Sequence, residues 1–96
     1  MEEMICGGIK TKWLFADMLK PDKHYLGQFC GTGKTLAKDG KTIIPYVVWV
    51  GVLDDGIAGE YQISTWRIES KKPFDANKPL AASIQRRGEN IFVSPI

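Results

Sequence analysis

The sequence holds few of the residues that enzymes use for acid–base, nucleophilic or metal chemistry. Its 96 residues contain one histidine and two cysteines. A single histidine cannot form a two-histidine metal site or a histidine relay, and the spacing of Cys6 and Cys30 matches no metal motif. His24 fits a turn or surface position just before Tyr25. We therefore expect a protein that is not an enzyme, with no catalytic residue, no metal site and no cofactor.

The chain also lacks the features of secreted and membrane proteins. Two cysteines are too few for a disulfide scaffold, and they fit best as small apolar side chains in a reducing compartment, with a single bridge as the alternative. Glu2 and Glu3 oppose the positive start of a secretion signal. No apolar run approaches the ~20 residues that span a bilayer. The sequence predicts a cytoplasmic protein with no membrane partner.

One segment resembles a phosphate-binding P-loop but lacks an essential residue. Gly31-Thr-Gly-Lys-Thr35 ends in a Gly-Lys-Thr triplet, and a P-loop needs a further glycine five residues before the Gly-Lys pair. Gln28 occupies that position. A helix should also follow the loop, whereas Lys38-Asp39-Gly40 is a strong turn signal. We interpret this segment as one arm of a β-hairpin.

Composition and turn spacing predict one mostly β domain over residues 1–96, with a loose N-terminal arm at 1–8. We expect a short helix at 12–20, which Pro21 ends, and strands at 25–30, 42–53, 60–68, 80–85 and 90–93. Gly31 to Gly33 permit a bulge, and a second bulge near Ser64 would place Tyr61 and Trp66 on one face. Five short strands predict a small OB-like or SH3-like barrel, with a curled sheet packed on the helix as the alternative.

The net charge of +2 is modest, but the basic residues fall into two segments. Five lysines lie between Lys20 and Lys41, and six cations lie between Arg67 and Arg87. An acidic turn at Asp54 and Asp55 separates them. Folded onto one face, the two segments would create a local positive field; an ordinary mixed surface is the alternative.

Aromatic residues are interleaved with these cations. In a small domain most aromatic side chains build the core, and we assign four of them there: Trp13, Phe15, Trp49 and Phe92. Tyr25, Phe29, Tyr46 and Trp66 are candidates for partly exposed stacking. Cations that follow phosphates and aromatic rings that stack on bases are typical of proteins that bind single strands. The sequence therefore predicts a non-enzymatic binder of single-stranded DNA or RNA, with contacts at Lys34, Lys38, Lys41, Tyr46, Tyr25, Phe29, Trp66, Arg67, Arg86 and Arg87.

Two stretches, residues 31–41 and Ala58-Gly-Glu-Tyr-Gln-Ile63, resemble the single-stranded DNA-binding proteins of filamentous phages. The resemblance covers under half of the chain. It implies an OB-type barrel, a homodimer and a basic β-wing that grips the strand, with Lys34, Lys38, Lys41 and Tyr46 as wing contacts. The alternative function is a small phage- or plasmid-encoded interaction module that inhibits a host protein complex, since its size, mixed charge and lack of catalytic groups suit both.

Overall fold

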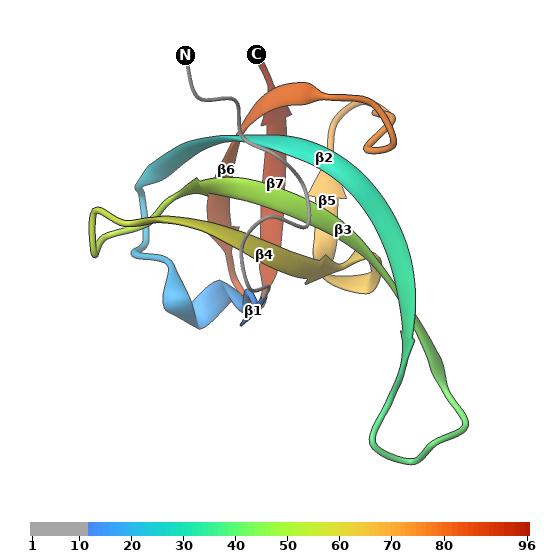
Figure 1. Ribbon diagram of the computed structural model, residues 1–96. Coiled ribbons are helices and arrows are strands. Elements are labelled where there is room, and N and C mark those ends of the chain that lie inside the picture. Colours follow the sequence, from blue (N-terminus) through green and yellow to red (C-terminus); the bar gives the residue numbers. More distant parts are fainter. Residues whose placement is uncertain (1–11) are drawn as a thin grey trace.

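The computed structural model describes residues 12–96, which form a single sheet of seven strands with two short 3-10 turns (Figure 1). The strands are β1 (Lys12–Trp13), β2 (His24–Leu36), β3 (Ile43–Val52), β4 (Ala58–Ser64), β5 (Ile68–Ser70), β6 (Leu80–Arg87) and β7 (Asn90–Pro95). The turns are η1 (Ala16–Met18) and η2 (Thr65–Arg67). The expectation of a mostly β protein is confirmed. The predicted N-terminal arm at 1–8 and Cys6 lie outside the described residues.

The sheet is curled, and a three-residue turn links β4 to the edge strand β5. Strands β2, β3 and β4 form an antiparallel meander, and β6 and then β7 pair on the other side of β2. β5 pairs with β7 in parallel and follows β4 after the three residues of η2. β1 pairs with β4, and within residues 12–96 no ladder joins β1 to β5, the two ends of the strand order. The sheet is therefore open between them and has seven strands rather than the expected five.

The two central strands extend beyond the rest of the sheet as a hairpin. β2 pairs with β6 only as far as Phe29, and β3 pairs with β4 only from Tyr46 onward. The residues between, 31–45, form a projecting two-stranded ribbon that we call the hairpin arm (Figure 1). The register shift between Phe29 and Gly31 confirms the expected bulge. Asp39 closes the predicted turn by accepting hydrogen bonds from the backbone N–H groups of Lys41 and Thr42 at 2.8 and 2.9 Å.

The core lies on the concave side of the sheet and is centred on Trp49, whose side chain is fully buried. Its ring crosses the paired glycines Gly27 and Gly51 so closely that a Cβ on either would lie 2.4 or 2.3 Å from the indole. Trp49 was expected in the core. Trp13 and Phe92 are half-buried, and Phe15 is exposed, so the assignment of Phe15 to the core is wrong.

The predicted helix at 12–20 is replaced by β1 and the single turn η1. Leu14 and Ala16 are buried while Phe15 between them is exposed, an alternation that belongs to extended chain. The Leu14 N–H donates to the Gln62 carbonyl at 2.9 Å and so continues the pairing of β1 with β4. Pairing with the sheet outweighs the helix propensity of these residues. No helix of the described residues is long and apolar enough to cross a membrane.

The expected bulge near Ser64 is also replaced, by η2. The Ser64 hydroxyl accepts from the Trp66 N–H at 3.3 Å, and β4 ends there. Tyr61 and Ile63 stay in the core, whereas Trp66 faces outward. Cys30, expected as a buried reduced thiol, is half-buried and is not a free thiol.

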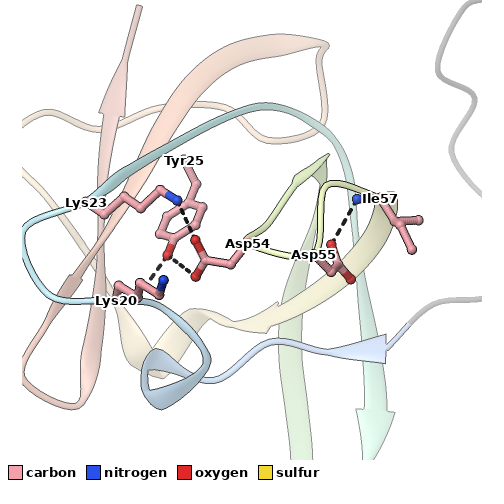
Figure 2. Close-up of polar contacts among 6 residues, drawn as sticks. All are labelled: Lys20, Lys23, Tyr25, Asp54, Asp55 and Ile57. Atoms are coloured by element: carbon pink, nitrogen blue, oxygen red, sulfur yellow. Dashed lines mark hydrogen bonds and ion pairs between the residues drawn. The ribbon is translucent and has the colours of Figure 1, made fainter.

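A polar cluster ties the first long strand to the turn after β3 (Figure 2). The buried Tyr25 hydroxyl donates to Asp54 at 2.8 Å and accepts from the Lys20 N–H at 2.9 Å. Lys23 pairs with the other carboxylate oxygen of Asp54. The hydrogen bonds from Lys23 and Tyr25 lower the pKa of Asp54, and burial raises the pKa of Tyr25. This cluster fixes one end of the sheet.

Candidate nucleic-acid interface

A groove with a volume of about 840 Å³ lies where four parts of the chain meet. One wall is the hairpin arm near Thr35 to Lys38, and another is the segment from Trp13 to Asp17, which includes most of η1. η2 and the turn between β6 and β7 complete it. All four parts are turns or strand ends, and the groove is lined both by core residues such as Leu14 and Ile91 and by exposed side chains.

Two large aromatic side chains in the groove are exposed to solvent. Trp66 of η2 is 60% exposed, and Phe15 before η1 is 58% exposed. Trp13 also lines the groove and meets the Tyr46 ring edge-on, with 5.9 Å between ring centroids. The Tyr46 ring in turn lies against Gly33 across the arm. The exposed rings thus offer apolar faces, and Tyr46 supports the wall behind Trp13.

Three cations line the same groove. They are Lys38 on the arm, Arg67 in η2 and Arg86 at the end of β6. Asp17 and Glu89 also line it, and Glu89 Oε2 lies 3.6 Å from Arg67 Nη1. Both members of this ion pair are mostly exposed. The groove therefore combines aromatic rings with three cations and two carboxylates. Its one ion pair, between Arg67 and Glu89, is weak because solvent screens it.

The structure brings together only some of the predicted contact residues. Four line the groove: Lys38, Trp66, Arg67 and Arg86. The other predicted cations do not line it: Lys34 lines an adjoining hollow of about 270 Å³ on the arm, which shares Thr35 and Leu36 with the groove. Lys41 is exposed next to the arm's turn, and the Arg87 guanidinium lies 5.1 Å from the centre of the Phe92 ring.

Two of the predicted stacking residues cannot stack. Phe29 is fully buried and Tyr25 is 3% exposed, so neither presents a ring face to a ligand, and the prediction of partly exposed rings at these positions is wrong. Both are needed inside, where Phe29 packs on Phe74 and Tyr25 reaches Asp54. Successive side chains of a strand point to opposite faces of the sheet. The bulge after Phe29 interrupts this alternation, so the buried face of β2 is hard to assign from sequence.

Sequence reasoning missed Phe15 as a groove residue. Its neighbours Leu14 and Ala16 are both apolar, so no contrast in polarity marks Phe15 as the exposed member. The only sequence signal against a helix at Phe15 is Pro21, which limits any helix in this segment to a few residues.

The described residues do not assemble a metal-binding cluster. Over residues 12–96 no three side chains from histidine, cysteine, aspartate and glutamate lie together in a way that could hold an ion. The segment that resembles a P-loop, Gly31 to Thr35, lies within β2 as extended strand rather than before a helix. What the groove offers is ring faces and positive charge.

The sequence matches no protein-family model, and comparisons with curated proteins and with solved structures find no match.

Proposed function

We propose that the protein is a non-enzymatic binder of single-stranded nucleic acid, and that the strand lies in the groove between the hairpin arm and the turn of β6 and β7. The observation that carries this proposal is the meeting of exposed rings with cations, Trp66 beside Arg67 in one three-residue turn. Bases would stack on Trp66 and Phe15, while Lys38, Arg67 and Arg86 would contact phosphates. Stacking tolerates any base because every base has a π-face.

The connectivity of the sheet supports an OB-like assignment. If β4 and β5 count as one strand interrupted by η2, the chain has five main strands in a curled, partly open sheet. OB folds bind oligonucleotides beside the hairpin loop that joins their first two strands and the loop that joins their last two. Here those loops follow β2 and β6, and residues of both line the groove.

The electrostatics of the groove favour an anionic ligand that enters from solvent. The Arg67–Glu89 pair is exposed on both sides, and exposed pairs contribute only about 0–1 kcal/mol. A phosphate can therefore replace Glu89 at little cost. Since the net charge of the chain is only +2, affinity depends on this local arrangement rather than on overall attraction.

The test is a fluorescence anisotropy titration of labelled oligo-dT and oligo-U with the wild type and with Trp66→Ala. Removal of one stacking ring should raise the dissociation constant by about 5- to 150-fold, because base stacking contributes about 1–3 kcal/mol. Ile96→Ala removes an apolar side chain that is even more exposed than Trp66 and does not line the groove, and this variant should bind as the wild type does.

Salt dependence provides the second half of this test. Affinity should fall as salt rises, because phosphate contacts release counterions, and the Arg67→Ala variant should show a slope smaller by about 1. If labelled single strands show no saturable binding at micromolar protein in low salt, the proposed function is wrong. Equal loss of affinity in Trp66→Ala and Ile96→Ala would show that the groove is not the site.

A further inference from the structure

The hairpin arm also carries an apolar surface that overlaps the groove at Leu36 and extends beyond it to Ile43. Leu36 and Ile43 face each other across the ladder, and each is more than half exposed. Together with Lys34 and Thr35 they line the shallow hollow on the arm. Because this apolar pair lies on a ribbon that projects from the sheet, we consider it as a candidate interaction surface.

Two lysines, Lys34 and Lys41, flank this apolar pair. We call Leu36 and Ile43 together with these two lysines the arm patch. Lys34 is adjacent in the hollow and Lys41 lies two residues before Ile43. No ion pair is formed by either lysine among residues 12–96. The acid of the arm, Asp39, uses its carboxylate to close the turn through Thr42 and Lys41. A partner that covers the arm patch should therefore be apolar with an acidic rim.

Exposed apolar side chains also occur at the other end of the sheet, next to the turn after β3. Val52 ends β3 and lies opposite Ala58. Leu26 of β2 is the next residue beyond the Gly27–Gly51 pair, which places it beside Val52. Ile57 leads into β4 from the turn, and all three apolar side chains are exposed. We call these three residues with Asp55 the turn patch.

The turn patch carries the opposite charge. Asp54 is engaged by Lys23 and Tyr25, but Asp55 accepts only the Ile57 N–H in the part of the chain that the structure describes, at 3.0 Å (Figure 2). No cation pairs with the Asp55 carboxylate among residues 12–96. Asp55 is also close enough to Tyr61 to contribute to the raised pKa of that phenol, after burial. The charge of Asp55 thus remains available to a partner.

The two patches lie at opposite ends of the molecule. In Figure 1 the turn after β3 and the tip of the hairpin arm point away from each other. A chain cannot fold its own arm onto its own turn patch, because both belong to the same continuous strand β3. Two complementary surfaces that cannot meet within one molecule can meet between two copies.

We propose that the protein associates with a second copy of itself head to tail, the arm patch of one molecule docking on the turn patch of the next. The contact joins two different surfaces, so it is heterologous and leaves a free patch at each end. Longer open assemblies form at higher concentration. Each patch is small, which makes the association weak and sensitive to salt.

The contact would place Lys41 of one molecule near Asp55 of the next, and a charge-swap experiment tests this arrangement. Sedimentation velocity of the nucleic-acid-free protein is measured for wild type, Lys41→Glu, Asp55→Lys and an equimolar mixture of the two variants. Each variant alone places like charges together and should weaken association by about three- to tenfold. The mixture places opposite charges at both kinds of contact and should restore it.

Controls separate this effect from misfolding. Asp55→Asn keeps an oxygen that can accept the Ile57 N–H, so it should fold as the wild type does and weaken association only by losing a charge. Ile57→Ser should weaken association, whereas Ile96→Ser, at an exposed position outside both patches, should not. Thermal unfolding of every variant identifies any loss of fold.

Three outcomes would overturn the proposal. One is a wild type that stays monomeric up to about 500 µM in low salt. Another is a mixture that associates no better than its two components. The third is stronger association of Lys41→Glu alone, which would indicate that arms meet arms. None of these measurements uses nucleic acid, so this proposal and the proposed function can fail separately.

Discussion

At the scale of single residues, Tyr25 shows how a side chain that resembles a binding group can serve the fold instead. It was expected to stack on a ligand, yet its ring is buried and its hydroxyl joins three segments. One hydrogen bond reaches Asp54 and the other fixes the chain after η1 through the Lys20 N–H. Lys23 lies over the ring, with its ammonium nitrogen 5.2 Å from the ring centre.

Tyr25→Phe should therefore lower stability without affecting the groove. It keeps the buried ring but removes both hydrogen bonds of the hydroxyl, which should cost about 1–2 kcal/mol in free energy of unfolding. Urea unfolding followed by circular dichroism measures this loss. Affinity for oligo-dT should stay within about twofold of the wild type. A large loss of affinity at unchanged stability would return Tyr25 to the candidate contacts.

At the scale of elements, β2 and β3 hold the sheet together through an aromatic ring over two glycines. Gly27 and Gly51 are paired across the ladder, and the Trp49 indole occupies the space where their side chains would be. A Cβ on Gly27 would also lie 2.5 Å from the backbone oxygen of Val50, which cannot move aside as a side chain can.

We expect Gly27→Ala to lower the free energy of unfolding by about 1–3 kcal/mol through overpacking. Gly59→Ala provides the control, because the nearest atom to its added Cβ would be at 3.0 Å, on the Tyr61 ring. Chemical denaturation of both variants should show the larger loss for Gly27. Equal losses would mean that the core around Trp49 adjusts more freely than its packing indicates.

The long strands and their turns could be predicted from sequence, and the short elements could not. Lys38-Asp39-Gly40 and Asp54-Asp55-Gly56 mark turns through local chemistry, so the strands on either side follow. β1 and β5 depend on partners far along the chain, Tyr61 and Ile91, and no local pattern reports them. Of the site, Lys38, Trp66, Arg67 and Arg86 were predicted. Phe15 was missed because its exposure is decided by the packing of its neighbours.

At the scale of the whole molecule, charge is arranged locally rather than in bulk. The net charge is only +2, but the groove and the arm patch are cationic while the turn patch is anionic. Such a distribution directs contacts without strong overall repulsion. The proposed strand-binding groove and the proposed head-to-tail contact hold different lysines, Lys38 in the groove and Lys34 in the arm patch, although both surfaces include Leu36.

Acid should destabilise the whole protein through two carboxylates. Hydrogen bonds from Lys23 and then Tyr25 lower the pKa of Asp54, and backbone hydrogen bonds from Thr42 and then Lys41 lower that of Asp39. A pKa lowered in the folded state stabilises the fold above the ordinary value of about 3.9, and this contribution is lost as pH falls through the folded-state value.

Urea midpoints measured between about pH 7 and about pH 2 should therefore fall most steeply below about pH 4. The double variant Asp39→Asn with Asp54→Asn should have a lower urea midpoint than the wild type at neutral pH. Its midpoint should fall less on acidification, because asparagine at these positions cannot take up a proton. Parallel curves for the variant and the wild type would assign the acid sensitivity to other groups.

The burial of the tryptophans also has an optical consequence. Trp49 is fully enclosed, and its indole N–H has no hydrogen-bond partner among residues 12–96. Trp13 is half-buried, and Trp66 is largely exposed. An indole in an apolar, unbonded site emits at shorter wavelength than one in water. The fluorescence emission of the protein is therefore the sum of contributions at different wavelengths. The short-wavelength emission from Trp49 reports on the integrity of the core, and the long-wavelength emission from Trp66 reports on ligand binding in the groove.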